Sequence, residues 1–295
     1  MNPVTTYVRS ITCCNRLFST ATRHPLVGVI RLTAGLELPK QLRFGFYSIW
    51  LRPAERCTPG CFGRQEFDFC DGTLIPLPPG SDVARPLWSG ESGGSGGQLL
   101  CFDSALFDPL AEGILSRRYS FFRYAVSESL HLSCRERMLL ERELTVIGEE
   151  LDWGVDECSH SILSERIRLL LDYVTRFYRR QFLLRHDAGV ELLRRTDADL
   201  EAFFRSGRAR RMPLPDAATL AGRCGCSESY FDDLLVCETG KTTRDYVAAK
   251  RLSVAERLLK RGDVPPEEVA AQLGFPTETA FCRQFRRLCG RRPGS

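Results

Sequence analysis

The spacing of hydrophobic residues changes along the chain from short, strand-like runs to helical periods. Between about Leu38 and Ala105 the apolar runs are short, rich in aromatic and β-branched residues, and interrupted by proline and glycine. Four of these runs are predicted to be strands: FGFYSIWL (44–51), FDFC (67–70), GTLIPLPPG (72–80) and GQLLCF (97–102). Strands of this length and spacing predict a small β-sandwich or barrel.

A glycine-rich stretch, SGESGGSGG (89–97), precedes the last of these strands. A phosphate-binding loop would lead into a helix N-terminus, whose backbone N–H groups then point at the phosphate. This stretch leads into a strand-like run instead, so we interpret it as a flexible connection between two strands.

From about Ser104 onward the apolar period becomes helical. The segment 133–151 opens with a capping box of Ser133 and Glu136, and the segment 159–184 continues the same period. The predicted apolar faces comprise Met138, Leu139, Leu144, Ile147 and Leu151 in the first helix and Ile162, Leu163, Ile167, Leu170, Leu171, Val174, Phe177 and Tyr178 in the second. These faces can pack within the chain or against a second copy, and periodicity does not distinguish the two.

A repeat occupies the C-terminal part of the sequence, after the arginine-rich boundary FFRSGRARRMPLP (203–215). LAGRCGCSESYFDDLLVCETG (220–240) aligns with VAAQLGFPTETAFCRQFRRLCG (269–290), with one residue inserted in the second turn. The matched positions are Ala221 with Ala270, Gly225 with Gly274, Phe231 with Phe281, Leu235 with Phe285, and Gly240 with Gly290. A small residue for close helix approach and a glycine for the turn predict a helix-turn-helix in each copy.

The segment between the copies, 241–262, has an apolar stripe through Tyr246, Val247, Leu252, Ala255, Leu258 and Leu259. One long helix is therefore predicted to hold the two units at a fixed separation. If both second helices enter successive major-groove windows, they should lie ~34 Å apart, about one turn of duplex.

The second helix of each unit is the part that a helix-turn-helix inserts into the major groove. Outward-facing positions are expected at Ser227, Glu228, Ser229, Asp232 and Asp233 in the first copy and at Thr277, Glu278, Thr279, Cys282, Arg283 and Arg286 in the second. The candidate DNA-binding residues are Ser227, Glu228, Ser229, Asp232, Lys241, Thr277, Thr279, Cys282, Arg283, Arg286 and Arg287. Arg283 is the candidate for a bidentate contact with guanine, and Arg286 and Arg287 for phosphate contacts or a solvated surface.

Charge, cysteine and hydropathy narrow the function classes. Residues 201–295 hold 17 basic and 12 acidic side chains, against 24 and 25 in the first 200, so a polyanionic partner would bind the C-terminal part. Thirteen scattered cysteines fit reduced thiols in a cytoplasm, and neither Cys57/Cys61 nor Cys224/Cys226 has a second pair for zinc. No apolar run is long enough for a membrane span, and no cofactor or metal is predicted.

At this point the sequence resembles a family, the arabinose-regulator (AraC/XylS) transcription factors. The resemblance rests on SYFDDLLVCETGKTTRDYV, AKRLSVAERLL, EEVAAQLGF and FCRQFRRLCG, and more loosely on HPLVGVI (24–30), FGFYSIWL, FDFCDGTLIPLPPG and the segments 119–137 and 168–182. It implies an α+β protein with an N-terminal cupin-like β-barrel and following helices, and an all-α C-terminal domain of two helix-turn-helix units joined by a long helix.

The implied organisation is an extension (1–23), a cupin-like sensory barrel (24–132), a helical dimerisation or linker region (133–205) and the DNA-binding domain (206–295). The implied protein is a sequence-specific DNA-binding regulator, an activator, that binds double-stranded DNA, forms a homodimer and acts on RNA polymerase. A small-molecule effector in the barrel is a possible further partner. A barrel lined by Phe44, Phe46, Tyr47 or Trp50 holds either a ligand or, as we favour, a packed core.

Two departures from the family pattern bear on function. In the first copy, the second helix carries Glu228, Asp232 and Asp233 and no arginine. Because carboxylates repel phosphate, the affinity for DNA should rest on the second copy. The sequence stops at RRPGS, where the family continues through a short closing helix.

Two alternatives stay open. The acidic first copy is compatible with a protein-interaction module whose degenerate helix-turn-helix no longer binds DNA. A metal-dependent cupin enzyme is the second, but residues 38–102 contain no histidine, and His24, His131, His160 and His186 lie apart from any nucleophile motif. We therefore predict that the chain is not an enzyme.

Overall fold

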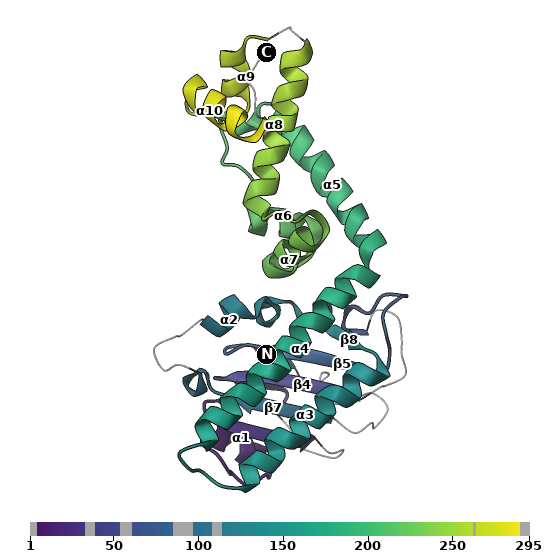
Figure 1. The fold of residues 1–295 in the computed structure, drawn as a ribbon, viewed down its shortest axis with the longest axis vertical. Coiled ribbons are helices and arrows are strands. Elements are labelled where there is room, and N and C mark those ends of the chain that lie inside the picture. The colour runs from purple at the N-terminus through teal and green to yellow at the C-terminus, as the bar shows by residue number, and fades with distance from the viewer. Residues whose placement is uncertain are drawn as a thin grey trace. The chain divides into compact units, whose positions relative to one another are not determined.

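The computed structural model describes residues 5–32, 39–53, 61–84, 97–107, 114–261 and 264–289. The chain divides into two compact units, Met1–Arg185 and His186–Ser295, and each is described by itself. Figure 1 colours the first unit from purple to teal and the second from green to yellow. Cys57 and the glycine-rich stretch from 89 to 96 lie outside the described residues.

The described strands of the first unit pair as two sheets. One has the order β1-β3-β6, with β1 parallel to β3, and the other is antiparallel with the order β2-β7-β4-β5-β8. The strands are β1 (Thr5–Val8), β2 (Val27–Leu32), β3 (Gln41–Phe44), β4 (Tyr47–Pro53), β5 (Gly72–Leu77), β6 (Asp82–Ala84), β7 (Gly97–Phe102) and β8 (Leu130–Leu132). The prediction of a β-rich first part followed by helices is confirmed.

Residues 67–70 are not a strand as predicted but lie in turns and irregular backbone. The physical reason is Asp68, which is buried and accepts a hydrogen bond from the Gln65 backbone N–H at 2.7 Å. The same carboxylate pairs with Arg185, which follows α4, at 2.5 Å between Oδ2 and Nη2. A side chain held this way draws the segment into a turn, although Phe67 and Phe69 look strand-like in sequence.

Two hydrophobic clusters cover the two faces of the five-stranded sheet. The cluster between the sheets contains Phe44, Phe46 and Trp50, each at most 1% exposed. Tyr47 belongs to the cluster on the opposite face, where its ring stacks on Phe102 with centroids 5.7 Å apart. Alternation along β4 thus places Tyr47 and Trp50 on opposite faces of the sheet, in two packed cores.

Helices α3 (Cys134–Asp152) and α4 (Ser159–Leu184) cross the five-stranded sheet and share its second cluster (Figure 1). The predicted capping box is present: the Ser133 N–H donates to Glu136 Oε2 at 2.9 Å, and the Glu136 N–H donates to Ser133 Oγ at 3.4 Å. Two residues of the predicted apolar faces are exposed instead, Met138 at 59% and Ile162 at 41%. Met138 precedes the buried Leu140 by two positions, about 200° around the helix, which places it outside the stripe.

The first described residues belong to this fold, although the sequence predicted only an extension before residue 24. Helix α1 (Ile11–Leu17) buries Ile11 and Cys14 in the cluster between the sheets, and β1 buries Val8 there. A shorter helix, α2 (Ile114–Arg118), lies farther along the same unit.

The second unit is all helical among its described residues, as predicted. Its helices are α5 (His186–Arg205), α6 (Ala217–Cys224), α7 (Glu228–Thr239), α8 (Thr243–Arg261), α9 (Pro266–Gln272) and α10 (Glu278–Cys289). They surround one hydrophobic cluster, to which α5 contributes Leu200, Phe203 and Phe204. Across the described parts of both units, every helix is too short or too polar to cross a membrane.

Candidate nucleic-acid interface

The first helix-turn-helix consists of α6, a glycine turn and α7. Asp216 caps α6 by accepting hydrogen bonds from the Thr219 N–H at 2.9 Å and the Thr219 hydroxyl at 2.6 Å. Gly225 ends the helix in the left-handed conformation, with φ of 71°, which explains the glycine found there in the sequence. Ser227 then caps α7 by accepting from the Tyr230 N–H at 3.3 Å.

The second helix-turn-helix repeats this arrangement with α9 and α10. Gly274 occupies the turn with φ of 76°, and a Cβ added there would meet the Ala209 carbonyl oxygen at 2.2 Å. Glycine is therefore required at this position both by its dihedral angle and by the close approach of the backbone. Thr277 accepts a hydrogen bond from the Ala280 N–H at 3.1 Å, the position that Ser227 holds in the first copy.

The two copies share the same internal contacts. The Cys226 N–H donates to Ala221 O at 3.1 Å, and the Phe275 N–H donates to Ala270 O at 2.9 Å, which is the same five-residue closure in both turns. The matched apolar residues Phe231, Leu235, Phe281 and Phe285 are each at most 2% exposed and lie in one cluster. The equivalence predicted from sequence spacing is thus present in three dimensions.

Helix α8 joins the copies, with α6 and α7 at one end and α9 and α10 at the other (Figure 1). It spans 19 residues, about 28 Å at 1.5 Å per residue. Its inward face includes Val247, Leu252, Val254 and Ala255, each at most 3% exposed. The predicted linking helix is present, and the spacing of the second helices on DNA stays a prediction.

Arg251 of α8 fastens the second turn, a role that the sequence analysis missed. Its side chain is buried, its Nε donates to the Leu273 carbonyl at 2.8 Å, and its guanidinium lies 3.4 Å from the Phe275 ring centroid. Burial lowers the pKa of Arg251 to about 10. The available signal was an arginine placed within an apolar stripe, between Val247 and Leu252.

The exposed surface of α7 is smaller than the sequence predicted. Glu228 is exposed, but Ser229 is only 7% exposed, so its predicted outward position is wrong. Ser229, Asp232 and Asp233 share one flank of the helix at i, i+3 and i+4, and both aspartates are half-buried. On it, Asp232 accepts a hydrogen bond from the Thr243 hydroxyl of α8. Asp232 is therefore half-buried and serves to brace α7 on α8.

The exposed surface of α10 carries the positive charge. Arg283, Arg286 and Arg287 are exposed, and within the described ranges none of them has an ion pair or hydrogen bond. Thr279 and Lys241 are exposed as well, whereas Cys282 is half-buried against the core cluster. Guanidinium groups of this kind can donate hydrogen bonds to phosphate oxygens or to guanine edges.

Two cations of α8, Lys250 and Arg257, differ from the arginines of α10 because α5 supplies acids that pair with them. Lys250 Nζ lies 3.2 Å from Asp197 Oδ2, and Arg257 Nη2 lies 3.1 Å from Glu201 Oε2. The Tyr246 hydroxyl donates to Asp197 at 2.7 Å, and burial together with this bond raises the pKa of Tyr246. Helix α5 is therefore part of the second unit both in its core and in its charge pairing.

The close cysteine pair in the first turn serves the fold. The Cys224 sulfur lies 3.6 Å from the Thr196 hydroxyl, and the Cys226 sulfur lies 3.8 Å from the Ala221 carbonyl. Within the described ranges no group of three or more His, Cys, Asp or Glu side chains is placed to hold a metal ion.

Comparison with known proteins places the C-terminal region in a family. The model described as "Helix-turn-helix domain" matches residues 220–295. The same length of chain is similar to the probable transcriptional regulator LumQ of Photobacterium leiognathi, with 34% identity over 76 residues. That match covers 26% of this chain and only 31% of LumQ.

Similar solved structures include the DNA-binding domain of AdpA and the protein ToxT. The first is the DNA-binding domain of the global transcriptional factor AdpA in complex with a target DNA. The match has 28% sequence identity and a TM-score of 0.29, and it covers 36% of this chain and 85% of the AdpA chain. ToxT from Vibrio cholerae is 13% identical and covers 91% of this chain and 96% of its own, with a TM-score of 0.28. These TM-scores are low, so the assignment rests on the family model and the sequence match. Residues 220–295 of this chain therefore match the helix-turn-helix domain family, and they are similar in sequence to part of a probable transcriptional regulator.

Proposed function

We propose that this chain is a sequence-specific DNA-binding transcription regulator. The observation that carries the proposal is the pair of equivalent helix-turn-helix units on one core. In the second unit, α10 presents to solvent three arginines that have no partner among the described residues. A phosphate backbone supplies most of the affinity of such proteins through contacts with Lys and Arg. The candidate contacts are Arg283 with a guanine edge and Arg286 and Arg287 with phosphate.

The proposal extends to the whole chain. Its first unit responds to a small effector or a partner, and the chain acts as a homodimer in the cytoplasm, where it activates transcription by recruiting RNA polymerase. No catalytic step is part of this function. The proposal takes the family membership of residues 220–295 as its support and the separate packing of the first unit as a suitable frame for sensing.

The alternative, a protein-interaction module, is favoured by one observation. Helix α7 has no basic residue, and Asp232 is committed to Thr243 rather than to solvent. In that case the first copy would serve as a protein surface and the second copy would not bind DNA specifically.

A binding selection with full-length protein and random duplex DNA, followed by a salt titration on the enriched sequence, separates these possibilities. Two enriched elements about one helical turn apart, with affinity falling as salt rises, support two DNA-reading helices. A single short element assigns reading to α10 alone. No enrichment would overturn the regulator proposal in favour of the interaction module.

A matched pair of variants sharpens the test. Arg283→Ala removes an exposed arginine from α10, and Arg123→Ala removes an exposed arginine from the first unit. Both change the net charge equally, so a loss of affinity in the first alone assigns the effect to α10.

A further inference from the structure

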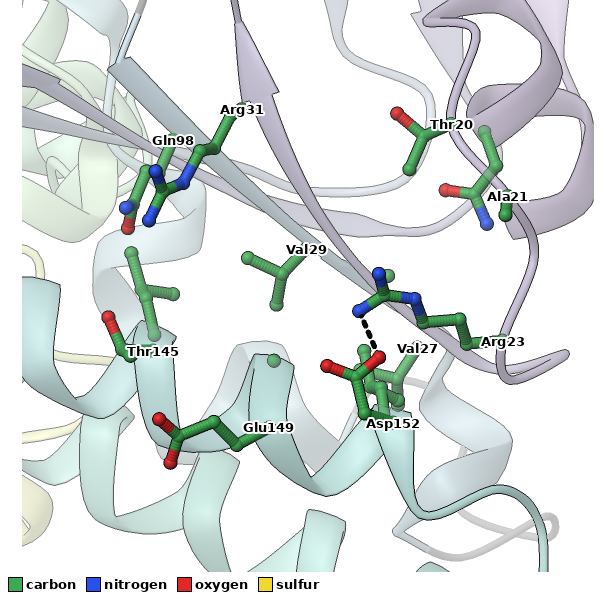
Figure 2. A pocket seen from close by; sticks show the side chains of 15 residues that line it. Thr20, Ala21, Arg23, Val27, Val29, Arg31, Gln98, Thr145, Glu149 and Asp152 are labelled. Atoms are coloured by element: carbon green, nitrogen blue, oxygen red, sulfur yellow. Dashed lines mark ion pairs between the residues drawn. The ribbon is translucent and has the colours of Figure 1, made fainter.

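A cavity lies in the first unit between the outer strand β2 and helix α3. Its volume is about 360 Å³, within the range of sites that hold small molecules. Figure 2 shows Val27 and Val29 of β2 facing α3 across it, with Thr145 and Glu149 on the helix side. Gly148 also lines the cavity, and a Cβ added there would meet nothing within 4 Å. The cavity thus has an apolar floor and space above it.

Two opposite charges line this cavity. Arg31 extends from β2 and Glu149 from α3, both are exposed, and neither makes an ion pair or hydrogen bond with a described residue (Figure 2). The charges at the other end differ, because Arg23 and Asp152 pair there at 2.6 Å. One cation and one anion therefore remain available on opposite walls.

Buried amide oxygens add unused acceptors to the same walls. Asn15 is 2% exposed, and its Nδ2 donates to the Thr22 hydroxyl at 3.3 Å, whereas its Oδ1 has no partner among the described residues. Gln98 lies opposite Arg31 in the pairing of β2 with β7, and its buried Oε1 lacks a partner there as well. A buried acceptor without a donor costs free energy, so a small shift of these side chains toward a donor in the cavity is favourable.

We propose that this cavity binds a zwitterion, an α-amino acid with a short apolar side chain. The carboxylate pairs with the guanidinium of Arg31, which can donate two parallel hydrogen bonds. The ammonium faces Glu149, and the apolar side chain covers Val27 and Val29. Because α3 forms one wall and β2 the other, the ligand joins the helix to the sheet edge. Binding follows from the cavity itself, and only its use as an effector rests on the proposed function.

Calorimetry with the full-length protein tests the ligand class. The probes are L-leucine and L-valine, with 4-methylpentanoate and 3-methylbutylamine as analogues of leucine that lack the ammonium and the carboxylate. Saturable binding of an amino acid is expected, with both analogues at least ~10-fold weaker, because each loses one charge contact. No saturable binding up to ~10 mM, or a carboxylate that binds as well as its amino acid, would overturn the proposal.

Variants assign the binding to this cavity. Arg31→Met and Glu149→Gln should each weaken amino-acid binding at least ~10-fold, whereas Glu150→Gln, the next residue on α3 and outside the lining, should not. Gly148→Leu should block binding by filling the space, and Gly148→Ala adds only a methyl group and serves as its control. Circular dichroism confirms folding of each variant. Unchanged binding in folded Arg31→Met and Gly148→Leu would place the ligand elsewhere and refute the site.

The same preparations separate this site from the proposed function. Amino-acid binding in a protein that selects no DNA sequence would support the site and refute the regulator. DNA selection without amino-acid binding would refute the site alone. If both occur, a change in DNA affinity on adding the amino acid identifies it as an effector, and this change should be absent in Gly148→Leu.

Discussion

The two helix-turn-helix copies differ on their outer surfaces while their interiors match. In the first copy α7 exposes Glu228 and commits Asp232 to a bond with α8. In the second, α10 exposes three arginines that pair with nothing in the described part of the chain. A repeat can therefore keep the residues that close its turn and lose the charge that a polyanion requires. Packing and binding are set by different faces of the same helix, so one can change without the other.

Because the two copies have matching interiors, shortening an equivalent buried side chain should lower the free energy of unfolding by a similar, large amount in each copy. Phe231→Ala and Phe281→Ala each delete a ring that is 0% exposed, and each should lower the free energy of unfolding by about 3–5 kcal/mol. Denaturant unfolding followed by circular dichroism measures both. A far smaller loss for Phe281 would show that the second copy is packed less firmly than the first, against the equivalence described above.

Arg251 is the internal contact that distinguishes the second copy. Arg251→Met keeps the aliphatic bulk but leaves the Leu273 carbonyl without its donor, and should cost about 1–3 kcal/mol in unfolding. Arg244→Met, an exposed arginine on the same helix, is the control and should change stability by less than about 0.5 kcal/mol. Equal effects of the two changes would remove the assigned role of Arg251.

The outer faces predict unequal effects on DNA recognition. Arg283→Ala should cost about 1–3 kcal/mol against the preferred sequence and relax the preference at one base position. Glu228→Gln in the first copy should leave the preference in place and raise affinity slightly, because it removes a negative charge near phosphate. Repeating the binding selection with each variant, and measuring its affinity for the enriched sequence, tests both expectations. An unchanged motif in Arg283→Ala would contradict the base contact.

The smallest expected effect concerns the salt dependence. The slope of log affinity against log salt is negative, and Arg286→Gln and Arg287→Gln should each reduce its magnitude by ~0.9 if the side chain contacts phosphate. Arg123→Gln in the first unit should leave the slope unchanged. Fluorescence anisotropy at several salt concentrations gives the slopes, and a slope that stays the same in both α10 variants would mean that these arginines only solvate the surface.

The repeat was predictable because its signals are local. Small residues, glycines and apolar positions at fixed spacing dictate the turn, the close approach and the inward face, and Gly225 and Gly274 occupy these places in the structure. The helices 133–151 and 159–184 were found for the same reason, within one residue of their observed ends. Local patterns predict local elements well.

The features that the sequence did not predict depend on contacts between residues that lie far apart in the chain. Asp68 turned a strand-like segment through its bond with Arg185, 117 positions away. Helix α5 belongs to the second unit because Leu200 and Phe204 pack there, which its own amphipathic pattern does not reveal. The positions of Ser229 and Arg251 follow from contacts with other helices, and the cavity beside β2 requires the placement of α3. Periodicity gives a face, but not what covers it.

Helix α8 has a consequence for the geometry of the two units that its length alone does not express. Thr243, the first residue of α8, donates a hydrogen bond to Asp232 of α7, and Arg251 donates one to Leu273 in the second turn. Both copies are therefore attached to the same helix. Each residue of an α-helix advances the chain by about 100°. The number of residues between these two attachment points therefore sets the angle, measured around the axis of α8, between the outer surfaces of α7 and α10. Adding or deleting one residue there would turn α10 by about 100° around α8 and would disrupt the cluster that both copies share.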